Sequence, residues 1–184
     1  MLNEIFEFFK NPEYTELNED NKTKTRLFFT LTAITVAFSL LLGMLAGLIT
    51  SIVGYDYEGH AVMDLFEAYS PVLLFFLVVI VAPVIEEFIF RGPLGFFKNS
   101  KHFKYAFYTS VLLFGVIHIG NFQNIDDYYW LIPVLVAPQI SAGIFLGFIR
   151  TKLGLVWSML LHAAHNLILI GPFIIMKLLD IPFE

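Results

Sequence analysis

The sequence lacks cysteine altogether and carries little charge. None of its 184 residues is Cys, and only 15% are Asp, Glu, Lys or Arg. The absence of cysteine excludes disulfide bonds, cysteine-bound zinc and thiol nucleophiles. The 11 Lys and Arg residues form no basic patch with interleaved aromatic side chains, so we expect no nucleic-acid partner. Residues 1–26 also lack the basic start and short apolar core that are typical of a secretory signal peptide.

Long apolar runs make up most of the chain. Hydrophobic residues account for 58% of it and the mean hydropathy is +0.75, whereas soluble domains contain about 45–50% apolar and about 25% charged residues. A helix crosses a bilayer with about 20 apolar residues. The sequence therefore predicts an all-α protein, a polytopic membrane helical bundle of about five to six transmembrane helices in a lipid bilayer. The expected spans are residues 25–53, 69–91, 103–119, 129–149 and 153–170.

The two ends of the chain carry apolar segments that are too short to cross a bilayer alone. Residues 1–24 are predicted to be a cytoplasmic N-terminal segment whose first apolar residues recur at helical spacing. That short helix either lies in the membrane interface or docks on its own domain. Residues 25–184 are predicted to form a single membrane domain. Within it, residues 173–179 either extend the fifth helix with a kink or lie at the interface.

The distribution of positive charge predicts the orientation. Ten of the 11 Lys and Arg residues fall before the first span, between the second and third spans, or between the fourth and fifth; the exception is Lys177. Cytoplasmic loops of membrane proteins are enriched in Lys and Arg. We therefore predict a cytoplasmic N-terminus and a cytoplasmic position for the end of the second span. Nothing in the sequence indicates an oligomeric state.

Two adjacent glutamates, Glu86 and Glu87, interrupt the second span. A carboxylate in mid-membrane costs about 2.5–3.5 kcal/mol on insertion scales, so ionisable residues at that depth are functional candidates. Glu87 and Arg91 are four residues apart and can pair on one helix face, whereas Glu86 points about 100° away. One interpretation makes Glu86 the reactive group, supported by Glu87 and Arg91. The other makes both glutamates interface anchors beside an Arg91 that reaches the membrane surface.

Histidines in two further spans are expected at a similar depth. At about 1.5 Å per residue from the cytoplasmic basic residues, Glu86, His118 and His162 lie about 18, 21 and 15 Å deep. This agreement requires Arg91 to lie below the membrane surface. Asn166 follows His162 by four residues and shares its helix face. The spacing therefore predicts that all four polar side chains meet.

A set of glutamate, histidine and asparagine side chains supports two kinds of chemistry. The set can activate a water and stabilise an oxyanion, or Glu86, His118 and His162 can bind Zn²⁺ with a water as the fourth ligand. The sequence lacks the His-Glu-x-x-His helix of many zinc proteases. This absence slightly favours a metal-free mechanism, and the zinc site remains the alternative. His165 is interpreted either as a supporting residue or as a packing residue.

Three short motifs, in order along the chain, resemble the signature of a known family. The motifs are Glu86-Glu87-x-x-x-Arg91, Phe114-x-x-x-His118 and His162-x-x-x-Asn166. Together they look like those of the CPBP intramembrane proteases, the Abi-like family of CAAX proteases and bacteriocin-processing proteins. The resemblance covers about residues 69–170. Each motif alone is weak, but three in this order on successive polar-bearing spans form a specific match.

The resemblance implies an intramembrane endopeptidase that acts on a membrane-associated protein or peptide, in CAAX-type or peptide-precursor processing. It also implies an integral protein of a bacterial plasma membrane. In this interpretation Glu86 accepts a proton from a water that His118 positions, and His162 and Asn166 donate hydrogen bonds to the oxyanion.

Two other interpretations belong to different functional classes. The first is a non-catalytic membrane scaffold or bacteriocin-immunity protein that uses the same cavity for binding, since the family also includes members thought to act as scaffolds. The second is a proton-coupled transporter with Glu86 in a proton relay. The transporter is less favoured because no internal repeat is visible in the sequence.

Overall fold

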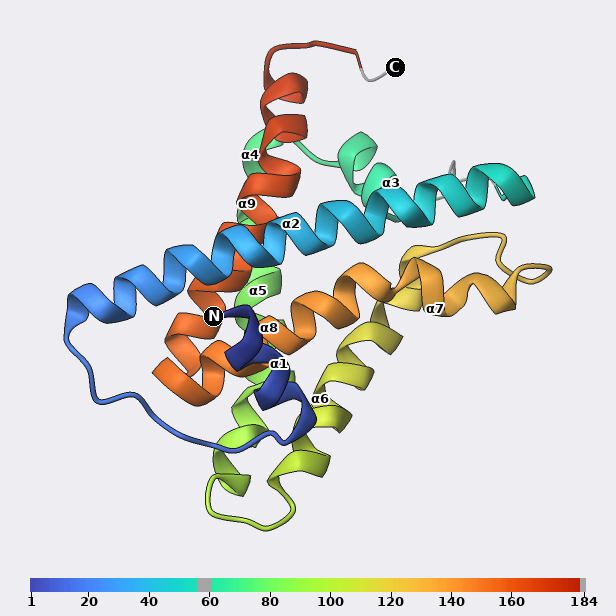
Figure 1. The fold of residues 1–184 in the computed structure, drawn as a ribbon. Helices are drawn as coiled ribbons and strands as arrows, with labels where there is room; N and C mark the ends of the chain where they lie inside the picture. Colours follow the sequence, from blue (N-terminus) through green and yellow to red (C-terminus); the bar gives the residue numbers. More distant parts are fainter. Residues whose placement is uncertain (56–60, 183–184) are drawn as a thin grey trace.

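The computed structural model describes residues 1–55 and 61–182 of the chain, and every regular element in these two stretches is a helix (Figure 1). The α-helices are α1 (Leu2–Lys10), α2 (Asn21–Val53), α3 (Ala61–Ala68), α4 (Pro71–Leu74), α5 (Ala82–Phe90), α6 (Phe103–Ile117), α7 (Ile132–Leu135), α8 (Ala137–Leu153) and α9 (Leu155–Leu178). The other helical elements are the π-helix η1 (Phe75–Val81) and the 3₁₀ helices η2 (Gly92–Phe97), η3 (His118–Asn121) and η4 (Tyr129–Leu131).

Five helical stretches of the described chain are long and apolar enough to cross a membrane. The predicted all-α, polytopic bundle is thereby confirmed, and the protein is an integral membrane protein. The stretches are Asn21–Val53, Pro71–Phe97, Phe103–Asn121, Tyr129–Leu153 and Leu155–Leu178.

The first and last spans extend beyond their predicted limits. Helix α2 begins at Asn21, because the side chain of Asp20 accepts a hydrogen bond from the backbone N–H of Thr23 at 2.8 Å and so caps the helix. Helix α9 continues through Pro172 to Leu178. Of the two alternatives for residues 173–179, the structure has the one in which they extend the fifth helix. Helix α3, which precedes the second span, was not expected from the sequence.

The second span changes its helical geometry three times. Ser70 caps its first turn, and Pro71 occupies a first-turn position, where its missing N–H costs nothing. The π-helix η1 then leads into α5, which carries Glu86 and Glu87. Just beyond Arg91, the span tightens into the 3₁₀ helix η2. Both glutamates therefore lie in the regular α-helical part, between a π-helical and a 3₁₀ segment.

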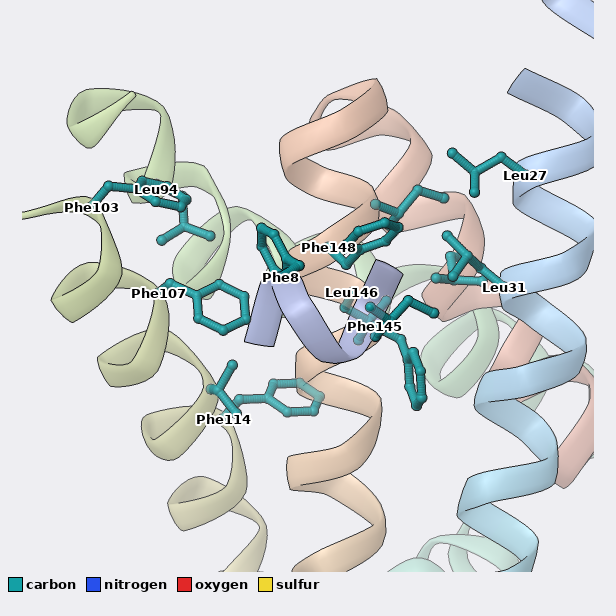
Figure 2. Packing of buried hydrophobic residues seen from close by; sticks show 14 residues of the cluster. Phe8, Leu27, Leu31, Leu94, Phe103, Phe107, Phe114, Phe145, Leu146 and Phe148 are labelled. Atoms are coloured by element: carbon teal, nitrogen blue, oxygen red, sulfur yellow. The ribbon is translucent and has the colours of Figure 1, made fainter. Parts of the chain in front are cut away.

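Aromatic side chains fill the main hydrophobic core around α6 and α8 (Figure 2). The ring of Phe8 meets those of Phe107 and Phe148 edge-on, at centroid distances of 5.0 and 5.1 Å. Helix α1 therefore docks on its own domain, as Figure 1 shows where it lies across α8. Leu2 and Phe6 on the same helix are exposed, and their contact with the membrane interface stays a prediction.

The linker after α1 contacts basic residues of two other parts of the chain, Lys98 and Lys152. Lys98, which follows the second span, forms an ion pair with Glu16 at 2.8 Å. Lys152, between the last two spans, donates to the hydroxyl of Thr15 at 2.7 Å, and its carbonyl accepts from the N–H of Leu17 at 2.8 Å. The three regions that hold most of the positive charge thus lie together. Their assignment to the cytoplasm stays a prediction from charge.

Candidate active site

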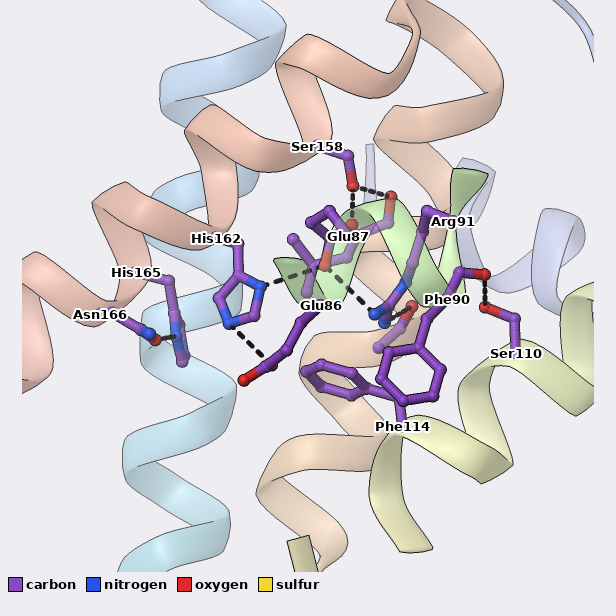
Figure 3. Close-up of polar contacts among 12 residues, drawn as sticks. Glu86, Glu87, Phe90, Arg91, Ser110, Phe114, Ser158, His162, His165 and Asn166 are labelled. Atoms are coloured by element: carbon purple, nitrogen blue, oxygen red, sulfur yellow. Dashed lines mark hydrogen bonds and ion pairs between the residues drawn. The ribbon is translucent and has the colours of Figure 1, made fainter. Parts of the chain in front are cut away.

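The neighbouring glutamates of α5 have very different surroundings. The side chain of Glu87 is fully buried and accepts three hydrogen bonds. Its Oε1 accepts hydrogen bonds from Nη1 of Arg91 at 3.1 Å and from Nδ1 of His162 at 3.0 Å (Figure 3). Its Oε2 accepts a hydrogen bond from the hydroxyl of Ser158. A carboxylate with a charged partner and three donors stays ionised and fixed in place. Glu87 therefore fastens α5 to α9 through Ser158 and His162.

Arg91 is as buried as Glu87, with 0% of its surface exposed. Its Nη2 donates to the carbonyl of Gly143 on α8 at 3.3 Å, and its guanidinium carbon lies 4.1 Å from the centre of the Phe114 ring. The close approach depends on glycine, because a Cβ at position 143 would lie 3.2 Å from Nη2. The guanidinium thus forms the ion pair that the spacing predicts, inside the bundle rather than at its surface.

A second arginine holds the end of α5. The Nε of Arg150 donates to the backbone carbonyl of Arg91 at 3.0 Å, and its guanidinium also bonds to the hydroxyl of Tyr14. Arg150 is 9% exposed and lies in the last turn of α8, within the fourth span, where the sequence predicted a polar turn. Sequence reasoning assigned it only to the cytoplasmic positive charge. Nothing local in the sequence distinguishes it from the other basic residues of the turns.

Glu86 is less buried than Glu87 and makes fewer contacts. Its side chain is 25% exposed, yet its Oε2 atom is buried and has no hydrogen-bond partner among the described residues. The Nε2 of His162 lies 3.8 Å from this oxygen, which is beyond hydrogen-bond distance. Because ionised Glu87 can only accept, Nδ1 of His162 carries the proton in the neutral ring and Nε2 presents a lone pair towards Glu86. One imidazole thus lies between the two glutamates.

His118 lies at the end of α6 and contacts the same aromatic ring as His162. Its Nδ1 donates to the carbonyl of Phe114 at 2.6 Å. The ring of Phe114 lies 4.8 Å from the centre of His118 and 5.6 Å from that of His162. The structure thus places His118 and His162 against one aromatic ring, and His162 also lies next to Glu86.

His165 and Asn166 make contacts that the sequence did not predict. The amide Nδ2 of Asn166 donates to the backbone carbonyl of Val78 in the π-helix at 2.9 Å. Its Oδ1 lies 3.2 Å from Nδ1 of His165, whose Nε2 lies 2.9 Å from the hydroxyl of Ser39 on α2. In Figure 3 both side chains lie on the side of His162 that faces away from Arg91. His165 therefore contributes a hydrogen-bond link between helices.

Sequence reasoning missed Ser158, which is fully buried and donates a hydrogen bond to Glu87. Its position contains a usable signal, because Ser158, His162 and Asn166 follow one another at intervals of four on α9. A stripe of polar residues at helical spacing in an apolar span indicates one shared polar face. Ser39 carries a weaker signal, since α2 contains several other serines and threonines.

The His, Asp and Glu side chains of the site bear on the zinc alternative. Among residues 1–55 and 61–182 there is no group of three or more His, Asp or Glu side chains placed to hold a metal ion. Among the described residues, Nε2 of His162 and Oε2 of Glu86 lie close together, but the free Nε2 of His118 is not grouped with them as a third donor. A catalytic zinc ion takes three protein ligands. Within the described stretches, the donor set that the zinc alternative requires is therefore not assembled.

Comparison with known proteins identifies the family. The family model described as Type II CAAX prenyl endopeptidase Rce1-like matches residues 68–168, which is more than half of the chain. No curated protein and no solved structure matches. The matched range contains the two glutamates, Arg91 and every His and Asn side chain described above for the site. The five long apolar helical stretches of the described chain agree with this match. The protein belongs to the Rce1-like family of type II CAAX prenyl endopeptidases, which are intramembrane proteases.

Proposed function

We propose that this protein hydrolyses a peptide bond of a membrane-associated protein or peptide, in CAAX-type or peptide-precursor processing. Glu86 activates the attacking water, His118 positions it, and His162 with Asn166 stabilises the oxyanion. Membership of the Rce1-like family supports the endopeptidase activity. We also propose that the protein lies in a bacterial plasma membrane with its N-terminus in the cytoplasm.

The observation that carries this proposal is the difference between the two glutamates. A general base must offer a lone pair within reach of the proton that it takes. Glu87 uses its oxygens on Arg91, His162 and Ser158. Glu86, within the described chain, keeps a buried oxygen without a hydrogen-bond partner. A water placed against this oxygen can transfer a proton to Glu86 while its own oxygen attacks a carbonyl carbon.

His118 is suited to hold that water. Its Nδ1 proton is used by the carbonyl of Phe114, so Nε2 of the neutral ring is an acceptor. The water donates one hydrogen to His118 and transfers the other to Glu86 as its oxygen attacks the scissile carbonyl carbon. Glu86 then delivers the proton to the amide nitrogen, the C–N bond breaks, and the acid and amine products leave. No step passes through a metal ion.

Negative charge develops on the former carbonyl oxygen during the attack. Asn166 has two amide hydrogens, of which Val78 takes one, so the second is available to the oxyanion. With hydrogens on both ring nitrogens, His162 donates from Nε2 to the oxyanion while Nδ1 donates to Glu87. Removal of one such donor costs about 2.7–4 kcal/mol in transition-state stabilisation.

Cleavage by purified protein in lipid vesicles tests the proposal. The substrates are a reporter with a prenylated C-terminal CAAX sequence and a hydrophobic peptide precursor. We expect Glu86→Gln to abolish cleavage, because an amide cannot take the proton. Glu16→Gln is the matched control, since Glu16 is exposed and bonded to Lys98; it leaves cleavage unchanged. Full cleavage by Glu86→Gln would refute the mechanism, and substrate binding without cleavage by the native protein would favour the scaffold or immunity function.

A further inference from the structure

The π-helix before Glu86 is followed by Pro83, and together they leave the backbone carbonyl of Val78 without a hydrogen-bond donor from its own helix. At the end of η1, the N–H of Ala82 bonds to the carbonyl of Leu77, five residues earlier. The next N–H in this series would come from residue 83 and would reach Val78. Residue 83 is proline, which has no N–H. The carbonyl of Val78 thereby loses the partner that the helix would otherwise supply.

Asn166 supplies this missing donor from another helix. Its Nδ2 lies 2.9 Å from the Val78 carbonyl oxygen, although the two residues are 88 positions apart. In the interior of a membrane protein no bulk water replaces such a bond, and a freed carbonyl is satisfied by side chains of neighbouring helices. The contact therefore fastens the π-helix of the second span to α9.

Two further residues determine how Asn166 is oriented. Since Nδ2 donates to Val78, the carbonyl Oδ1 of Asn166 accepts from Nδ1–H of His165 at 3.2 Å. The other ring nitrogen of the neutral His165 then accepts from the hydroxyl of Ser39 at 2.9 Å. Ser39 is 6% exposed. Every bond in this series has a defined direction, from Ser39 through His165 and Asn166 to Val78.

We propose that Ser39 and His165 are positioning residues that act through Asn166 on the π-helix and thereby on Glu86. The inference rests on the proposed function, in which Glu86 is the base. A π-helical turn holds one more residue than an α-helical turn. If the segment relaxed to an α-helix, Glu86 would rotate by about 100° relative to the first half of the span. The Ser39–His165–Asn166 series holds the register that points Glu86 at His162.

A double-mutant cycle between Asn166→Ala and Pro83→Ala tests the link. Alanine at position 83 restores a backbone N–H for the Val78 carbonyl. We expect Asn166→Ala to lower the thermal midpoint in lipid vesicles, and to lower it by less than half as much when Pro83→Ala is present. Residues that share a partner show such non-additive effects. Additive shifts in the midpoint would overturn the inference, and this readout does not depend on protease activity.

Kinetics of Ser39 variants test the positioning role. We expect Ser39→Ala to lower kcat for the vesicle-bound CAAX reporter by about tenfold or more, since small misplacements of reacting groups have effects of that order. KM should change less than twofold, and Ser39→Thr, which keeps the hydroxyl, should restore kcat. Ser51→Ala is the control, because Ser51 is an exposed serine of the same helix. A native kcat in Ser39→Ala would overturn the role, whereas inactivity of the native protein would instead refute the proposed function.

Discussion

The Nε2 atom of His162 lies 3.8 Å from Oε2 of Glu86, while Nδ1 of the same ring is bonded to Glu87. The bond to Glu87 fixes the orientation of the imidazole, because Glu87 is itself held in place by its buried ion pair with Arg91. The two glutamates are adjacent in the sequence, yet Glu87 is bonded to Arg91, Ser158 and His162, whereas Oε2 of Glu86 has no hydrogen-bond partner among the described residues.

Stability measurements should separate the two glutamates. Glu87→Gln leaves the buried charge of Arg91 without its counter-ion, and breaking a buried pair in this way costs about 3–5 kcal/mol. Glu86→Gln removes no hydrogen bond that the structure shows within the described chain. We expect a large drop in thermal midpoint for Glu87→Gln and almost none for Glu86→Gln, measured by unfolding in detergent. Equal losses would show that Glu86 is also an anchor.

Ser158→Ala should weaken the site through Glu87 without touching Glu86. The hydroxyl of Ser158 is fully buried and bonded to Oε2 of Glu87. Loss of one partner of a buried acceptor costs about 1–3 kcal/mol. We expect a lower thermal midpoint and a lower kcat, because His162 loses the rigid carboxylate that orients it. Ser158→Thr, which keeps the hydroxyl, should retain more activity than Ser158→Ala; the reverse order would contradict the role.

Two glycines on different helices should respond differently to substitution by alanine. A Cβ at Gly147 on α8 would lie 2.5 Å from the buried ring of Phe107, so α6 and α8 would have to separate. Such overpacking typically costs about 1–3 kcal/mol. A Cβ at Gly47 on α2 would have nothing within 4 Å among the described residues. We expect Gly147→Ala to lower the thermal midpoint and Gly47→Ala to leave it unchanged or slightly raised.

The ion pair between Glu16 of the linker and Lys98, which follows the second span, should depend on pH. The hydrogen bond and charge of Lys98 hold the pKa of Glu16 below its ordinary value. A lowered folded-state pKa means that this contribution to stability is complete above the ordinary glutamate pKa and is lost as the pH falls through the lowered one. We expect the small difference in thermal midpoint between native protein and Glu16→Gln to vanish at acid pH. Both residues are exposed, so high salt should also reduce it.

Chelation should leave cleavage unchanged. The proposed mechanism uses a carboxylate, a water and hydrogen-bond donors, and the described residues do not assemble a three-ligand metal group. We expect vesicle-bound protein to keep its cleavage rate after dialysis against a zinc chelator, and metal analysis to find no stoichiometric zinc. Loss of activity that is restored by Zn²⁺ would contradict this expectation. A zinc-dependent protease of known sensitivity serves as the control for chelator action.

The sequence by itself determined the membrane class, the five spans and the pairing of Glu87 with Arg91. These features depend on local periodicity. An apolar run of sufficient length crosses a bilayer whatever surrounds it, and residues four apart meet on any α-helix. The same periodicity separated Glu86 from Glu87 by about 100° on the helix. It carried no information about which groups on other helices each glutamate would meet.

Only the tertiary structure decided those partners. Arg150 contacts the backbone of Arg91 from 59 residues away, Ser158 lies under Glu87, and Ser39 reaches His165 across 126 residues. Asn166 bonds to Val78 because Pro83 removes a donor in a different span. Buried polar groups must be satisfied, but the neighbour that satisfies them is set by how helices cross and pack. That packing arises from contacts between distant segments, which helical spacing within one segment does not encode.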